Sequence, residues 1–260
     1  MKPHKYTFTE KESKLTIISE SKGAISRARG AFYTHRAILE EYVASHDTFL
    51  KSFNPVQSQS EHEVIKLMAE AGYVFDVGPM AAVAGVLADL MLAAMKYDDT
   101  LKNPPKIALV ENGGEIAIDS EKAMKVALYA GNNELNFNLG FLIEKKDSPI
   151  GIGTSSATVG HAVSLGEADA VTIFAKNATF ADAAATKIAN LVKGDDIEKS
   201  IKTALDKVAD YPDVYGAFIS RGDRIGRAGK VPKLIKLTDV PRIGIKDQEL
   251  IDKINERVLE

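Results

Sequence analysis

One stretch of the chain, Val77–Met95, is nearly all apolar and has to be buried in either a membrane or a protein core. It is rich in alanine rather than leucine, and it contains Pro79, Gly85 and Asp89. A carboxylate in the middle of a membrane span costs roughly 2.5–3.5 kcal/mol on insertion scales. The stretch therefore predicts a buried core helix, with Pro79 at the first helical position, where no amide donor is needed. Asp89 is its one charge, and a buried carboxylate needs a partner whether it is structural or part of a site.

The segments before this helix show both strand and helix periodicity. Alternation over 5–19 predicts a hairpin, and apolar spacing over 31–53 predicts a helix. Ser60 and Glu63 form a capping-box pattern. We expect this pattern to start a second helix, which Gly72 ends before a short strand.

The second half of the chain is predicted to hold mostly strands. They are expected over 107–110, 124–129 and 139–144, and as a closing hairpin over 214–228, with an amphipathic helix capped by Asp195-Asp196 before that hairpin. Strands and helices do not alternate regularly, which favours an α+β fold over a doubly wound sheet. Since there is no internal repeat and no low-complexity linker, we expect one compact domain over 1–240. Residues 241–260 are expected to form a C-terminal tail or a short helix.

The composition excludes several classes of site. The formal net charge of −3 gives no electrostatic case for binding nucleic acid or an anionic membrane. The chain has no cysteine, which excludes disulfides, thiol nucleophiles and thiolate metal sites. The N-terminus is polar, without an apolar signal core, so we expect a cytoplasmic protein.

Residues 148–186 carry the strongest functional pattern. Thr154-Ser155-Ser156 follows an apolar strand and offers hydroxyls and amides to a phosphate or to the polar edge of a cofactor. Asp182 and Thr186 are four residues apart, so on a helix they share a face. A carboxylate and a hydroxyl form the hard, oxygen-rich environment that Mg²⁺ prefers. The alternative is that Asp182 lies in a first helical turn, where a carboxylate is favourable without any ligand.

Three further features leave alternatives open. Gly113-Gly114 follows a strand and either lets a ligand approach the backbone or forms a plain hairpin turn. His161 lies between two strands and is either structural or, beside a metal–phosphate site, a general base. Gly151–Ser156 lacks the third glycine of a dinucleotide fingerprint, and no Gly-Lys-Ser/Thr is present, which disfavours a nicotinamide oxidoreductase and a P-loop.

The order of these motifs resembles the ApbE superfamily, the FAD:protein FMN transferases, and is most similar to a cytoplasmic, uncharacterised branch of it. The resemblance covers roughly residues 70–230. It implies an α+β fold of the T-fold type that binds FAD and Mg²⁺. It also implies transfer of FMN to a protein hydroxyl, or hydrolysis of FAD to FMN and AMP. The partners it implies are a flavin nucleotide and a target flavoprotein.

The resemblance assigns roles to particular residues. Asp182 and Thr186 match the family's Asp-x-x-x-Thr metal motif, and His161 is the candidate catalytic base. The residues expected to bind the cofactor are Gly78, Gly85, Asp89, Asn112, Gly113, Gly114, Thr154, Ser155 and Ser156.

The chain also departs from the family pattern. The family's lysine before Gly85 is Ala84, and its usual asparagine two positions before the glycine pair is Glu111. The block that begins at His161 lacks its Asp-Pro. These departures support a second hypothesis, a non-catalytic nucleotide-binding or assembly module that retains the fold. Apolar surface on the 79–95 helix leaves room for a homodimer.

Overall fold

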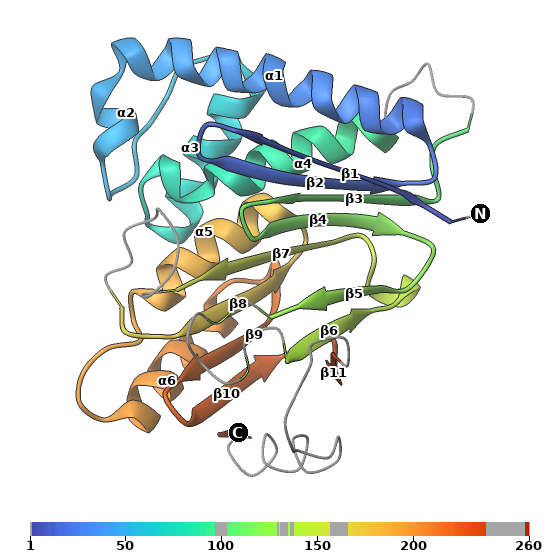
Figure 1. Cartoon of the computed structure of the whole chain (residues 1–260). Coiled ribbons are helices and arrows are strands. Elements are labelled where there is room, and N and C mark those ends of the chain that lie inside the picture. Colours follow the sequence, from blue (N-terminus) through green and yellow to red (C-terminus); the bar gives the residue numbers. More distant parts are fainter. Residues whose placement is uncertain are drawn as a thin grey trace.

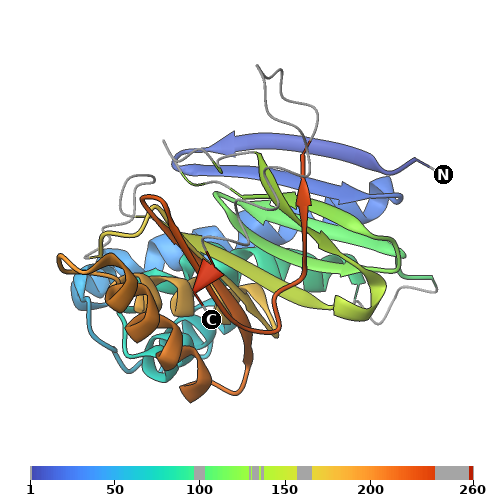
Figure 2. The same cartoon turned by 90° about the horizontal axis from the view of Figure 1, so that it is seen from below.

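The chain folds into three layers: helices, a nine-stranded sheet, and a small three-stranded sheet on the opposite face (Figures 1 and 2). The computed structural model describes residues 2–96, 103–128, 130, 135, 138–156, 166–237 and the backbone of 258–259. Among these, helices and strands do not alternate regularly, and a single domain holds both, so the expected α+β class is confirmed.

The large sheet is antiparallel except at one edge. Its order is β1 (His4–Glu10), β2 (Ser13–Ser19), β3 (Ile107–Asn112), β4 (Glu115–Ser120), β7 (Ile150–Ser155), β8 (Ala170–Ala175), β9 (Val214–Arg221), β10 (Arg224–Gly229) and β12 (Val258–Leu259). Only β12 pairs in parallel with its neighbour, β10. The small sheet has the order β11 (Lys233–Lys236), β6 (Leu139–Ile143) and β5 (Met124–Ala127).

The helices gather on one face of the large sheet (Figure 1). They are α1 (Lys22–Ser45), α2 (Asp47–Lys51), α3 (Glu63–Phe75), α4 (Val83–Lys96), α5 (Ala178–Ala189) and α6 (Ile197–Asp206), with short 3₁₀ turns η1 (Pro79–Ala82), η2 (Lys145–Asp147) and η3 (Lys207–Asp210). Because side chains alternate across each strand, the sheet contributes side chains to two hydrophobic cores. One core lies under the helices and the other under the small sheet.

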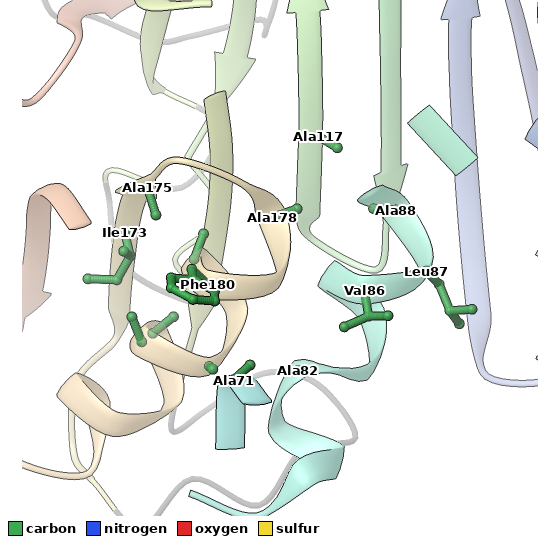
Figure 3. Close-up of a cluster of buried hydrophobic side chains, with 14 of the residues drawn as sticks. Ala71, Ala82, Val86, Leu87, Ala88, Ala117, Ile173, Ala175, Ala178 and Phe180 are labelled. Carbon is green, nitrogen blue, oxygen red and sulfur yellow. The ribbon is translucent and has the colours of Figure 1, made fainter. Parts of the chain in front are cut away.

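The apolar stretch at 79–95 forms η1 and α4, as the sequence predicts, with Pro79 in the first turn. Within the described residues, Pro79–Lys96 is the one helical stretch that is long and apolar enough to pass as a membrane span by length and composition. Most of its side chains are buried against α1, α5 and the sheet. Figure 3 shows Ala82 and Val86 from this stretch beside Ala178 and Phe180 of α5.

Several local predictions are confirmed and others are wrong. The hairpins at 5–19 and 214–228, the strands near 107–110, 124–129 and 139–144, and the Asp196 cap of α6 are all present. However, α1 starts at Lys22 rather than near 31, because Ser21 caps it by accepting from the Ala24 amide. Residues 238–257 of the expected tail lie outside the described residues, and Val258–Leu259 forms β12.

The end of α3 corrects two predictions at once. Helix α3 runs through Gly72 to Phe75, so the expected stop at Gly72 and the short strand after it are wrong. A Cβ at Gly72 would lie 2.9 Å from the Val77 carbonyl oxygen. Glycine is therefore required there for close packing and not for termination. The expected capping box is also absent, since His62 is the N-cap residue and its side chain makes no capping bond.

The small sheet is attached to the large one by aromatic packing, which gives a stability prediction. Phe141 of β6 is buried, and its ring centroid lies 4.9 Å from that of Phe174 and 5.7 Å from that of Phe218. We expect Phe141→Ala to lower the free energy of unfolding by about 3–5 kcal/mol, measured by urea denaturation. Tyr73→Ala, at a side chain that is 73% exposed, serves as the control and should change it by less than about 0.5 kcal/mol. A loss below 1 kcal/mol for Phe141→Ala would contradict this packing.

Candidate functional site

Helix α5 carries Asp182 and Thr186 in its middle rather than at its start. The helix begins at Ala178, and the side chain of Asn177 caps it by accepting from the Phe180 amide at 2.8 Å. Asp182 therefore lies beyond the first turn of α5. The helix dipole stabilises a carboxylate mainly within that first turn. The first-turn alternative for Asp182 is wrong. Asp182 and Thr186 share one face of α5, and both are half-buried.

Glycines bring β7 directly against α5. A Cβ at Gly151 would collide with the backbone of Asn177 and Ala178. A Cβ at Gly153 would lie 2.5 Å from the Ala181 carbonyl carbon and 2.7 Å from the Asp182 nitrogen. The two glycines of the predicted turn are thus part of the strand, where they let the helix rest on the backbone. The end of β7 is held beside Asp182 as a result.

The start of α4 binds the carboxylate of Asp182. The Gly85 amide donates to Asp182 Oδ2 at 2.9 Å, and a hydrogen bond from the Ala84 amide also lowers the pKa of Asp182. A Cβ at Gly85 would lie 2.9 Å from the Asp182 Cβ. Gly85, which the family pattern singles out, is therefore a close-approach residue in contact with the expected metal ligand.

The Gly113-Gly114 turn is a hairpin, and it also belongs to the same group of residues. It connects β3 to β4 with positive φ at both glycines, 69° and 124°. Just before it, Asn112 is buried and its Nδ2 donates to the Ala84 carbonyl at 3.2 Å. Just after it comes Glu115, on the face of β4 that lies toward α5.

Glu115 and Asp182 form a pair of neighbouring carboxyl groups. Glu115 is buried, and burial raises its pKa well above its usual range, with further increases from Asp182 and Glu111. Its own amide and that of Thr154 donate to it and act in the opposite direction. Burial likewise raises the pKa of Asp182, to about 7, against the hydrogen bonds from Gly85 and Ala84. Glu115 was not among the expected site residues, although its place directly after the glycine pair could have indicated it.

The three hydroxyl residues at the end of β7 have different orientations. The Thr154 hydroxyl lies 3.1 Å from that of Thr172 on β8, while the Thr154 amide faces Glu115. Because strand side chains alternate, Ser155 lies on the α5 side of the sheet. Ser156 is half-buried and precedes residues 157–165. His161, the candidate base, lies outside the described residues.

Two of the expected cofactor residues have structural partners elsewhere. Asp89 accepts hydrogen bonds from Ala178 and Thr179 at the start of α5. A Cβ at Gly78 would collide with the Ser52 carbonyl, so Gly78 allows the chain after α2 to pass closely. The structure thus brings together Gly85, Asn112, Gly113, Thr154 and Asp182, together with Glu115. Gly114 and Ser155 are neighbours of these residues along the chain, and Thr186 lies one turn further along α5 than Asp182.

We refer to Glu115, Asp182 and Thr186 as the carboxylate site. Within the described ranges, no set of three or more histidine, aspartate and glutamate side chains is gathered as a cation site. A cation here would therefore have two carboxylates and a hydroxyl as its candidate donors. Desolvation and the neighbouring acidic groups raise the pKa of both carboxyl groups. A divalent cation between the two groups would lower both pKa values again. All-oxygen donors fit Mg²⁺ or Ca²⁺ and do not favour softer metals.

Comparison with known proteins identifies a family, relatives and a shared fold. The family model described as "AbpE bacteria" matches residues 1–215. A UPF0280 protein of Methanococcus maripaludis is 42% identical over 229 residues, covering 87% of this chain and 90% of that protein. A UPF0280 protein of Methanocaldococcus jannaschii is 39% identical, with 87% and 91% covered. A variant of the flavin transferase ApbE from Vibrio cholerae shares the fold, with a TM-score of 0.51, 12% identity, and 88% of this chain and 97% of that one covered.

The raised pKa of Asp182 gives a pH prediction for the protein without divalent cations. The folded protein holds a proton that the unfolded chain releases near pH 3.9. The resulting stabilisation is complete below that value and is lost as the pH rises through about 7. We therefore expect the free energy of unfolding of wild type, measured with urea in a chelator, to decline from pH 4 to pH 8.

The control for this prediction is Asp182→Asn, whose side chain stays neutral over the whole range. Its stability should decline less than that of wild type between pH 4 and pH 8. The part of the decline that remains includes the contributions of Glu115 and Asp89, because burial raises the pKa of both carboxyl groups as well. Parallel curves for the two proteins would rule out an Asp182 that is protonated in the folded state.

Proposed function

Because this chain belongs to the ApbE-like family described as AbpE bacteria, we propose that it binds FAD together with Mg²⁺ at the carboxylate site. The observation that supports this best is the pair of neighbouring carboxyl groups, Glu115 and Asp182, whose pKa values are both raised. Two such groups without a lysine or arginine that lowers the pKa of Asp182, among the residues described, are a favourable place for a divalent cation.

Asp182 and Thr186 would hold the cation, with Glu115 beside them as a second carboxylate. Bound Mg²⁺ supplies charge neutralisation and polarisation of a pyrophosphate. The exposed turn at Gly113-Gly114 has no side chains to keep a nucleotide from its backbone. Ser155, on the same side of the sheet, supplies a hydroxyl for the phosphate or the polar edge of the cofactor.

The reaction we propose is displacement at the FMN phosphorus of FAD. A hydroxyl oxygen of a target protein, or water, forms the new P–O bond, and AMP leaves with the electrons of the pyrophosphate bond. The proton of the attacking hydroxyl goes to a base, for which His161 is the candidate. The target is a protein that presents a Thr or Ser hydroxyl, and the reaction takes place in the cytoplasm.

Two departures from the family pattern favour a second function, nucleotide binding without turnover. Ala84 stands in place of a lysine, so its side chain offers no positive charge to a phosphate. The block that begins at His161 lacks Asp-Pro, and that block carries the candidate base. In this alternative the fold serves as a binding or assembly module.

Calorimetry with FAD and MgCl₂ tests the binding step. We expect wild type to bind FAD in the presence of Mg²⁺. Asp182→Ala should weaken that binding at least tenfold, since it removes a charged cation ligand. Asp196→Ala is the matched control, because Asp196 only caps α6, and its FAD affinity should equal that of wild type. Absence of binding to wild type at high micromolar FAD would falsify the proposal.

Incubation with FAD and Mg²⁺ separates the two functions. The transferase or hydrolase predicts release of AMP, with FMN appearing in solution or as protein-bound fluorescence. The binding module predicts bound FAD that is recovered intact. Sustained release of AMP would exclude the module.

A further inference from the structure

Helices α4 and α5 hold each other at two points that lie one helical turn apart. At the first point, Asp89 of α4 accepts from the Ala178 amide at 3.0 Å, the Thr179 amide at 2.7 Å and the Thr179 hydroxyl at 2.6 Å. At the second, the Gly85 amide of α4 donates to Asp182 Oδ2 on α5 at 2.9 Å. On each helix the two residues are four apart, which is about 6 Å along the axis.

The two contacts fix how far α5 can slide along α4. Gly85 precedes Asp89 on α4, whereas Asp182, the partner of Gly85, follows Ala178 on α5, so the helices are antiparallel. Gly85 lies between its partners, since a Cβ there would collide with the Ala178 carbonyl oxygen and approach the Asp182 Cβ to 2.9 Å. Axial movement of α5 therefore breaks both hydrogen-bonded contacts together, and a larger residue at position 85 would force the helices apart.

Asp89 is essential to the first turn of α5. The first amides of a helix have no partner inside it, and those of Ala178 and Thr179 are buried, with both residues at 2% exposure or less. Asn177 satisfies the amides of Phe180 and Ala181 with its side chain and carbonyl. Asp89 satisfies the amides of Ala178 and Thr179. Without its carboxylate, two buried donors lose their acceptor, which is costly enough to displace the turn.

We propose that Asp89 is a positioning residue that makes the carboxylate site selective for Mg²⁺ over Ca²⁺. This rests on the proposed function. Asp182 and Thr186 lie on the helix that Asp89 holds, whereas Glu115 lies on β4, so a shift of α5 moves two of the three proposed donors relative to the third. Mg²⁺ requires near-octahedral ligands at about 2.0–2.1 Å, while Ca²⁺ accepts a variable shell at about 2.3–2.6 Å. A displaced α5 therefore weakens Mg²⁺ binding more than Ca²⁺ binding.

The test is calorimetric titration of the full chain with MgCl₂ and with CaCl₂, in the absence of flavin. Asp89→Asn keeps the size of the side chain but directs an amide group, itself a donor, at the amides of α5. We expect the Kd for Mg²⁺ to rise about 10–100-fold, in the range found when groups behind a metal ligand are removed. The Kd for Ca²⁺ should rise less, so that the ratio of the two affinities falls. A purely structural role would lower the melting temperature without changing this ratio.

Two matched sets of variants keep the outcome independent of folding. Thr179→Val removes one donor of the Asp89 contact and keeps the shape, whereas Thr179→Ser keeps the hydroxyl. The valine variant should lower the Mg²⁺/Ca²⁺ affinity ratio and the serine variant should restore it, even if Asp89→Asn fails to fold. Asp196→Ala removes the cap of α6 and should leave both affinities unchanged.

The possible failures are distinguishable. If wild type binds Mg²⁺ and Asp182→Ala does not, but Asp89→Asn and Thr179→Val keep the wild-type affinity ratio, the positioning role is overturned and the proposed function stands. An equal loss of Mg²⁺ and Ca²⁺ affinity overturns the selectivity in the same way. If wild type binds neither cation, both the cation site and the role of Asp89 are overturned.

Discussion

The rest of the structure depends on the contact between α5 and β7, in which a helix backbone lies on a strand backbone. Ordinary side chains separate a helix backbone from a strand backbone, and larger residues at 151 and 153 would collide with α5. Gly151 and Gly153 remove that obstacle, and buried alanines on α5 complete a close interface. Because α5 lies this close, the residues at its middle reach the ends of β4 and β7. The glycines of β7 and the alanines of α5 thus serve first to pack the helix against the strand. The candidate site lies on this interface.

The same closeness explains why acidic groups are tolerated beside the core. Backbone amides of α4 and β7, rather than basic side chains, donate to the carboxyl groups of Asp182 and Glu115. Amide donors lower the pKa of a carboxyl group, but here burial outweighs them, and both pKa values are raised. The protein therefore maintains two carboxyl groups that a divalent cation would convert to their charged forms. Glu115 would thus add a second carboxylate to the all-oxygen site that the sequence predicts at Asp182 and Thr186.

The parts of the fold that the sequence predicts well are those determined by local pattern. The helix at 79–95 follows from an apolar run that starts with Pro79, and the hairpins follow from alternation and glycine turns. Predictions failed where packing, rather than the local sequence pattern, decided the role of a residue. Gly72 has the composition signal of a helix end, yet the Val77 carbonyl above it requires a glycine inside the helix. Asp89 could be assigned to a site or to a structural role from the sequence, and only its contacts with a segment 89 residues away show the structural one. Glu115 directly follows the glycine pair, but its interaction with Asp182, which is far away in the sequence, could not be read from that position.

The long sequence separation between elements that contact each other has a kinetic consequence. Strand β4 pairs with β7 across an inserted pair of strands, and α4 is joined to α5 by hydrogen bonds that close loops of roughly ninety residues. Closing loops of this length is slow, because the entropy of loop closure is lost before the stabilising long-range contacts form. During synthesis the β3–β4 hairpin with Glu115 emerges well before α5, so a nascent chain holds half of the carboxylate site with nothing to complete it. If the carboxylate site binds a cation as proposed, that affinity would arise only at the last stage of folding, once the two halves of the chain have come together.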